Sequence, residues 1–266
     1  MNNFKNNIKF HSTVSGITTL QVASTLITFA LVFAGFDWQW WVLAVGVYYL
    51  TGCLGITITF HRYITHRSFK MPKWCEYLFS FFGAMGGTGS SIGWMAVHNA
   101  HHKFSDLPGD PHSPHELGLK MMLSNYTYDF QLMHAKNLLR DKFHVFLHQY
   151  YYLVMLGWAT VLLAIDYRLC LFGFFVPAFL QIWTSNISNY GNHMWGYRNF
   201  KLDDNSTNTW WISAITWGEG WHNNHHAEPW TYTFQRKWWE FDISAYTIYV
   251  ICLLSGTKLS LYNAKY

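Results

Sequence analysis

The sequence has few charged residues. Asp, Glu, Lys and Arg together make up 12% of its 266 residues, whereas a soluble globular domain averages about 25%. This shortage nearly excludes a water-soluble globule, and the 15 tryptophans suit a protein with long contact zones at both faces of a bilayer. We expect a single integral membrane domain over residues 1–266, because no charged stretch beyond a linker indicates a second, soluble module.

Paired cysteines and basic clusters are also missing. The four cysteines lie far apart without a C-x-x-C pair, which argues against both a disulfide framework and a thiolate metal site. The net charge is only +4 and no polybasic run occurs, so no nucleic-acid partner is expected. The first apolar run is longer than a signal-peptide core and lacks an A-x-A cleavage site, so we interpret it as a retained anchor.

Long apolar segments predict the membrane-spanning helices. Four of them lie in windows without charged residues that exceed the ~20 residues needed to cross about 30 Å of hydrocarbon. Short connections at Phe36-Asp37 and at Asp166-Tyr167-Arg168 join them into two tight helical hairpins. The predicted spans are residues 17–35, 38–59, 150–165 and 169–188.

Two further apolar windows differ from these spans. Residues 77–97 contain five glycines, which weaken a continuous helix facing lipid, so we expect a buried or re-entrant segment. The run Ile243–Gly256 is too short to span and is expected to lie in the membrane interface.

The distribution of basic residues predicts the orientation. The hairpin tips contain one basic residue, Arg168, of the 18 in the chain, and cytoplasmic loops carry the excess of Lys and Arg. Both termini and a cap formed by residues 60–149 and 189–266 are therefore expected on the cytoplasmic side. The absence of organelle or retention signals favours a bacterial inner membrane.

Histidine is the strongest chemical signal. Of 15 histidines, nine fall in groups, and the pattern H-x-x-H-H occurs twice. Residues three and four apart share a helix face, so each such pattern predicts one chelating cluster. The first pair is five residues apart, about 140° on an ideal helix, so one member is expected at a helix end or kink. The nine are His61 and His66; His98, His101 and His102; His193; and His222, His225 and His226.

Clustered imidazoles of this number predict two metal ions. Neutral imidazole binds Fe, Zn, Cu and Ni in preference to Mg or Ca, and nine ligands exceed what one ion needs. Histidines satisfied only by backbone or lipid headgroups are a poor alternative, because clustering them brings desolvation and repulsion without gain. A non-catalytic metal transporter remains an alternative of another class, but its ligands should lie near the bilayer midplane. No H-E-x-x-H motif supports a zinc hydrolase.

The sequence around the histidines resembles the membrane fatty acyl desaturase family, in its Δ9 acyl-CoA or acyl-lipid branch. The resemblance extends over nearly the whole chain. It rests on three histidine boxes, on Asp110-Pro-His112 after the second box, on Asn189 four residues before His193, and on Trp238-Trp-Glu-Phe-Asp242. The boxes read His61-Arg-Tyr-Ile-Thr-His66, His98-Asn-Ala-His101-His102 and His222-Asn-Asn-His225-His226.

The resemblance implies a fold and a reaction. The fold would be an all-α integral membrane protein with four transmembrane helices under a cytosolic helical cap. The cap would hold two irons through the nine histidines, with Asn189 acting through water. The reaction would be O2-dependent removal of two hydrogens from a saturated fatty acyl chain, as acyl-CoA or acyl lipid, to give a cis double bond. A separate ferredoxin or cytochrome b5-like donor would supply electrons, because the sequence has no His-Pro-Gly-Gly haem motif.

Some residues depart from the family pattern or have roles the pattern leaves open. Asn99 and Gly93 replace the usual Arg and Glu, and the segments after His193 and His226 also differ. The family pattern therefore does not determine the acyl carrier, the surface that binds the electron donor or the position of the double bond. A fatty acyl or lipid hydroxylase on the same scaffold is the alternative within this chemistry. Trp94, one turn before His98, is a candidate for lining the acyl tunnel. Other candidates are the carboxylates Asp106, Asp110, Glu219 and Asp242 as partners of ligand rings, and the basic residues Arg62, Arg67, Lys70, Lys73 and Lys103 as contacts for phosphate or an acidic donor.

Overall fold

The computed structural model describes residues 14–123, 132–257 and 259, and its regular structure over these residues is helical. The prediction of an all-α protein is confirmed for this part of the chain, in which the extended segments form only isolated bridges. The two termini, expected on the cytoplasmic side, lie outside the described residues. In chain order the helices are α2 (Val14–Phe33), α3 (Trp38–Tyr48), η1 (Tyr49–Thr65), α4 (Lys73–Met85), α5 (Ser91–Phe104), α6 (Pro114–Leu117), α7 (Lys120–Leu123), η2 (Leu132–Ala135), η3 (Leu138–Arg140), α8 (Lys142–Gln149), α9 (Tyr151–Ile165), α10 (Tyr167–Cys170), η4 (Leu171–Phe175), α11 (Val176–Gly191), α12 (Trp210–Ile215), α13 (His222–Ala227) and α14 (Ile243–Ser255).

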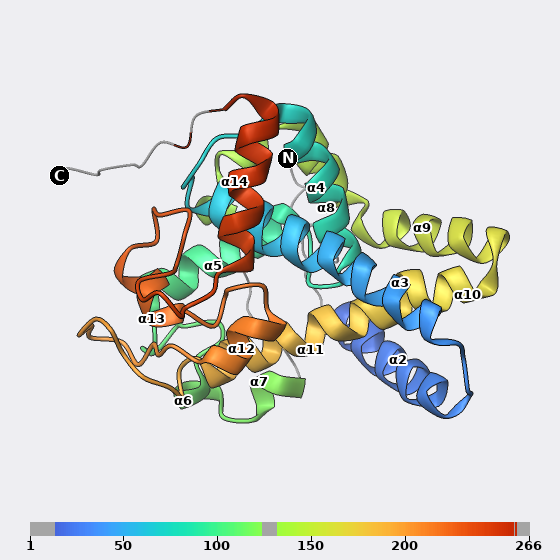
Figure 1. The fold of residues 1–266 in the computed structure, drawn as a ribbon, viewed down its shortest axis with the longest axis horizontal. Helices are drawn as coiled ribbons and strands as arrows, with labels where there is room; N and C mark the ends of the chain where they lie inside the picture. Colours follow the sequence, from blue (N-terminus) through green and yellow to red (C-terminus); the bar gives the residue numbers. More distant parts are fainter. Residues whose placement is uncertain (1–13, 124–131, 258, 260–266) are drawn as a thin grey trace.

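The helices separate into two regions (Figure 1). The apolar helices α2, α3, α9 and α10 extend to one side, the helices α5, α6, α12 and α13 lie on the other, and α11 leads from one region to the other. Large apolar side chains such as Leu26, Phe33 and Leu163 are exposed on the first region. Exposed apolar surface of this extent is typical of a protein that contacts lipid.

Three helices are long and apolar enough to cross a membrane: Gly16–Phe33, Trp38–Thr65 and Tyr167–Gly191. They correspond to three of the four predicted spans. The fourth, residues 150–165, is only α9, and its 15 residues measure about 22 Å, short of the hydrocarbon thickness of about 30 Å. It joins α8 at a bend of 78°, so a fourth span exists only if this bent pair is taken as one.

The bend between α8 and α9 follows a change in chemical character at Tyr150. In α8, the buried ring of His144 lies with its Nε2 3.0 Å from a carboxylate oxygen of Glu76. In α9 there is no charged residue, and Leu153 and Leu156 are exposed. Polar contacts hold the first helix in the cap, whereas the second has an apolar surface suited to lipid, so the chain turns between them.

The helix α3 continues without interruption into η1, which is a π-helix. In a π-helix each N–H bonds to the carbonyl five residues earlier. The side-chain hydroxyls of Thr59 and Thr65 follow the same spacing and donate to the carbonyls of Leu54 and Phe60, each at 2.7 Å. Residues five apart therefore lie on adjacent turns of this helix, and π-helical segments are frequent at functional sites.

The glycine-rich window 77–97 is not one helix. It is divided between α4 and α5, and neither is a candidate span in the described chain, as predicted. The helix α4 crosses η1 where Gly55 meets Gly83: a Cβ atom added to Gly55 would lie 2.3 Å from the backbone nitrogen of Gly83. Two glycines at a helix crossing allow the backbones to approach closely.

The two hairpin tips pack together around Phe172. This fully buried ring contacts Phe36, Trp40 and Trp41, with ring centroids 5.1 to 5.9 Å apart. The guanidinium of Arg168 lies 4.8 Å from the centroid of the Trp40 ring. The first predicted hairpin, formed by α2 and α3, is close only at its connection. Along its length, α2 packs mainly on α11 and η4.

The helix α14 forms where a short helix at the membrane interface is predicted. Asp242 caps its first turn by accepting a hydrogen bond from the backbone N–H of Ala245 at 3.0 Å. Ile248 and Cys252 are buried beside η1, while Leu254 is 81% exposed. A helix with one buried face and one exposed apolar face is consistent with the predicted location in the interface.

We predict that Gly55→Val destabilises the protein. Its side chain must displace the backbone of Gly83, and overpacking of this kind costs about 1–3 kcal/mol. Thermal unfolding of the purified protein in detergent measures the effect. Gly157→Ala is the control, because nothing lies within 4 Å of a Cβ atom at that position. An equal unfolding temperature for Gly55→Val and the wild type would contradict the close crossing.

Candidate metal centre

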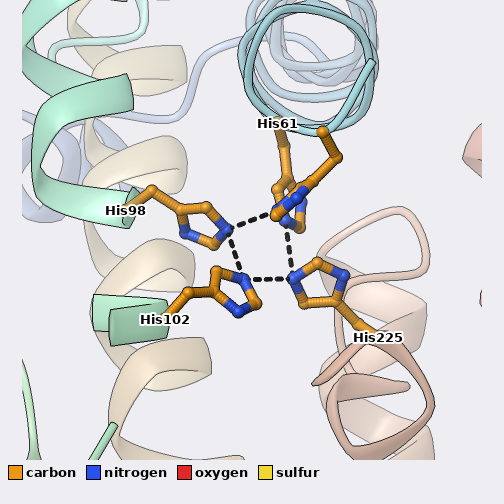
Figure 2. A group of neighbouring side chains, drawn as sticks. His61, His98, His102 and His225 are labelled. Carbon is orange, nitrogen blue, oxygen red and sulfur yellow. Dashed lines mark hydrogen bonds between the residues drawn. The ribbon is translucent and has the colours of Figure 1, made fainter. Parts of the chain in front are cut away.

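Five of the nine predicted histidines form one group. Their ligand atoms, one from each ring, all lie within 4.8 Å of one another. The Nε2 of His102 lies 2.8 Å from that of His225 and 3.0 Å from that of His98, and the Nε2 of His61 lies 3.0 Å from that of His225. Figure 2 shows the rings of His61, His98, His102 and His225 directed toward a common centre. The members are His61, His66, His98, His102 and His225.

The other four histidines form a second group with the same arrangement. The Nε2 atoms of His101 and His226 are 3.3 Å apart, and those of His193 and His222 are 3.1 Å apart. The ring of His101 is fully buried, and its centroid lies 5.8 Å from that of the neighbouring His102 in the first group. The members are His101, His193, His222 and His226.

The division corrects one sequence prediction. We expected each H-x-x-H-H pattern to form one cluster, but each pattern contributes to both groups. On α5, His98 and His102 are four residues apart and share a face, whereas His101 is turned by about 100° from His102. The helix therefore lies between the two groups. In α13 the same geometry sends His225 to the first group and the pair His222 and His226 to the second.

The pair His61 and His66 meets because η1 is a π-helix. Their ring centroids are 4.9 Å apart. The backbone N–H of His66 donates to the carbonyl of His61 at 3.1 Å, which continues the five-residue spacing of η1, and His66 is the C-cap residue. The expectation that one member lies at a helix end is confirmed.

Carboxylates hold the outer nitrogen of three rings in the second group. A metal-binding histidine usually donates its other ring N–H to such a partner, which fixes the tautomer. The sequence predicts Asp106 and Asp110 as partners but misses Asp204, a loop residue without any motif around it. The Nδ1 atoms lie 3.0 Å from Asp110 for His101, 2.8 Å from Asp106 for His193, and 2.7 Å from Asp204 for His226.

These carboxylate partners determine which ring nitrogens face the interior of the second group without a proton. A neutral imidazole has one N–H, and in His101 and His226 it points outward to a carboxylate. Their Nε2 atoms, 3.3 Å apart, then face each other with lone pairs and no proton between them. Facing lone pairs repel unless a cation lies between them, so this donor set fits a transition-metal ion.

The protonation of the rings agrees with this interpretation. Burial lowers the pKa of His98, His101 and His225 well below the usual value, and the neighbouring imidazoles lower it further. Neutral imidazole is the form that binds metals. Burial is the largest single influence on the pKa of Asp106 and would raise it, but the interaction with His193 and the hydrogen bonds from Asn205 and Ser113 together outweigh burial and lower that pKa to about 2. The carboxylate partner therefore stays charged.

Arg62 is connected to the first group of histidines through Glu219. This guanidinium is fully buried and lies 2.8 Å from Asp242 and 3.2 Å from Glu219. A carboxylate oxygen of Glu219 in turn lies 2.5 Å from the Nδ1 of His61. The interpretation of Arg62 as a contact for phosphate or an electron donor is therefore wrong, because the side chain is enclosed between two carboxylates.

Another cluster of potential metal ligands consists of Glu76, Asp141 and His144, but a lysine side chain lies among them. The ammonium group of Lys73 lies 2.8 Å from a carboxylate oxygen of Glu76 and 2.8 Å from one of Asp141. The lysine already supplies the positive charge that a metal ion would bring. This cluster is a structural ion-pair network, and it also accounts for one basic residue that we considered as a phosphate contact.

A cavity extends from the histidines toward the apolar helices. Its lining includes His61, His98 and His222 at one end and Tyr48 and Gln181 at the other. Trp94, predicted to line the acyl tunnel, and Asn189, predicted to reach a metal ion through water, are also part of the lining. The Trp94 ring is stacked on His98 with centroids 4.8 Å apart. The predicted position of Trp94 beside the tunnel is thus consistent with the structure.

Comparisons with known proteins give a consistent picture. A family model described as fatty acid desaturase matches residues 38–245. An sn-1 stearoyl-lipid 9-desaturase of Anabaena variabilis is 33% identical over 248 residues, which are 89% of this chain and 90% of that protein. Delta-9 acyl-lipid desaturase 1 of Arabidopsis thaliana is 36% identical over 89% of this chain and 82% of its own length.

A second protein of Arabidopsis thaliana is also similar. This palmitoyl-monogalactosyldiacylglycerol delta-7 desaturase of the chloroplast is 36% identical over 225 residues, which are 80% of this chain. The matched part is 60% of that longer protein, so the chain spans less than two thirds of this relative.

We predict that Asp204→Asn weakens metal binding at the four-histidine group. The amide cannot hold the proton of His226 as a carboxylate does, and loss of such a partner typically lowers metal affinity about 10–100-fold. Iron content after dialysis against a chelator measures the change. The matched control is Asp203→Asn, a change at an exposed neighbour. Equal iron retention by the two variants would show that Asp204 does not support the site.

Proposed function

Since this chain belongs to the fatty acid desaturase family, a family of enzymes, we propose that it is a membrane-bound, O2-dependent desaturase. It introduces a cis double bond, at Δ9, into a saturated fatty acyl chain. The single observation that carries the proposal is the convergence of nine imidazoles in two adjoining groups beside a cavity.

The two groups would each hold one iron ion. His61, His66, His98, His102 and His225 would bind the first, and His101, His193, His222 and His226 the second, with Asn189 acting through water. When bound, the irons and O2 supply the oxidising power to break an alkane C–H bond, which acid–base side chains cannot do. Nitrogen-only donors with carboxylates one step away fit this assignment.

The protein itself would position the acyl chain beside the metal site and exclude water from it. The cavity brings an acyl chain past His61, His98 and His222, with Trp94 packed on His98 as one wall. Enclosure excludes water from the reacting carbons. Glu219 and Arg62 fix the ring of His61, and three aspartates fix rings of the second group, so the ligands are oriented before the substrate arrives.

We propose an acyl lipid as the substrate and a separate carrier as the electron donor. The names of the relatives from Anabaena variabilis and Arabidopsis thaliana both specify acyl lipids. The donor would be a ferredoxin or cytochrome b5-like protein, because the sequence contains no haem motif or cysteine cluster of its own. With the cap facing the cytoplasm of a bacterial inner membrane, such a donor would dock on the surface of the cap that covers the histidines.

Metal transport fits the structure less well. Transport ligands should lie at the centre of broken helices in the membrane. Here the histidines lie at the end of η1 and on the helices α5 and α13 of the second region in Figure 1. This position favours an enzyme whose metal site lies outside the hydrocarbon.

We predict that His101→Ala and His225→Ala each abolish product, because one removes a ligand from each metal group. The test is expression in a host that lacks unsaturated fatty acids, with mass-spectrometric mapping of double bonds. His134→Ala is the control, since this residue belongs to neither group. A hydroxylated product from the wild type would show that the reaction is hydroxylation and not desaturation. Activity in either ligand variant would overturn the assignment of that histidine as a metal ligand.

A further inference from the structure

A second cavity, of about 310 Å³, lies on one face of α8. Four of its lining residues belong to this helix and recur at intervals of three and four, so they share a face. They are Lys142, Val145, Phe146 and Gln149. Other residues of α8, among them His144 and Leu147, are buried. Among the described residues, none lines both this cavity and the one beside the histidines, so the two are separate.

The charged groups that line this second cavity are all positive. Arg140, at the end of η3, and Lys142, in the first turn of α8, line it, and no carboxylate of the described chain does. Neither cation forms an ion pair within the described residues, where the paired Lys and Arg are Arg62, Lys73, Arg168, Arg198 and Arg236. Two unpaired cations in one cavity favour an anionic ligand.

The carboxylate nearest to them in sequence is already satisfied elsewhere. Asp141 stands between Arg140 and Lys142 but is not part of the lining. It accepts a hydrogen bond from the backbone N–H of Phe143 at 3.0 Å and lies 2.8 Å from the ammonium group of Lys73. Its negative charge is therefore matched by a lysine outside the cavity.

The position of α8 indicates where the anion comes from. The helix meets α9 at a bend of 78°, and α9 extends with the other apolar helices in Figure 1. A helix nearly perpendicular to such a helix lies along the membrane surface. Phe146 and Tyr150, which line the cavity, are exposed, and Leu153 on α9 continues the exposed apolar surface. The cavity thus lies between two cations and a surface suited to lipid.

We propose that this cavity binds the headgroup of an anionic phospholipid. Arg140 and Lys142 bind the phosphate, the amide of Gln149 donates to an ester carbonyl, and the acyl chains follow α9 past Leu153. Basic pockets at the membrane surface bind anionic headgroups in this way. A zwitterionic headgroup brings a cation of its own, which finds no carboxylate here. The bound lipid is distinct from the substrate, and the inference does not depend on the proposed reaction.

The test measures lipid binding by native mass spectrometry of the full-length protein in detergent. The probes are phosphatidylglycerol, which is anionic, and phosphatidylcholine with the same acyl chains. One Lys or Arg near a lipid surface contributes a factor of about five. We therefore expect Arg140→Gln combined with Lys142→Gln to weaken phosphatidylglycerol binding about 30-fold and to leave phosphatidylcholine binding unchanged. The control combines Lys136→Gln with Lys201→Gln, two exposed lysines outside the cavity.

Three outcomes would overturn the proposal. Equal losses in the two double variants would mean that net charge, and not this cavity, attracts the lipid. Equal affinity of the wild-type protein for both lipids, a comparison that needs no variant, would exclude selection by headgroup charge. Displacement of the lipid by millimolar glycerol 3-phosphate would assign the cavity to a soluble phosphate. A protein that binds the lipid as expected but makes no double bond would contradict only the proposed function.

Discussion

The arrangement of the protein depends on one electrostatic constraint: many imidazole lone pairs are directed at each other. In the second group, carboxylates hold the ring protons of three histidines on the outside, which leaves Nε2 atoms such as those of His101 and His226 facing each other at 3.3 Å. Such an arrangement is repulsive by itself and becomes favourable with cations at its centre. The cap segments that carry these rings are separated by long stretches of sequence, so metal binding and the folding of the cap are coupled.

The turn before α13 connects the two ends of the cavity. Trp217 lines the cavity beside Tyr48, and Glu219, two residues later, contacts His61 and Arg62. Gly218, between them, has a φ of +114°, and a Cβ atom there would lie 2.4 Å from a carboxylate oxygen of Asp242. The same turn therefore positions a wall of the cavity and a support of the metal ligand.

The sequence predicts much of this site because short-range geometry determines it. Spacing of three and four residues indicated the six histidines of the two H-x-x-H-H patterns, and Asp106 and Asp110 follow the first of these patterns closely. His193 stands alone in the sequence, and the role of Asn189 rests on the resemblance to the desaturase family. The division into two groups depends on the lateral position of α5 between them, which no local pattern contains. Asp204 and the burial of Arg62 depend on loops that meet only in the folded cap. The expected fourth span is short because α8 is held by polar contacts of the cap, and the charge count did not reveal the bend.

The hairpin tips contain three charged residues, Asp37, Asp166 and Arg168, of which only one is positive. Their basic residue, Arg168, is paired with Asp166 and lies over Trp40. A partner that recognises positive charge therefore finds little to bind on that face. If the chain acts on membrane lipids from the side of the cap, as proposed above, it would introduce double bonds into the lipids of one leaflet first, and the fluidity of the opposite leaflet would depend on how fast lipids cross the bilayer.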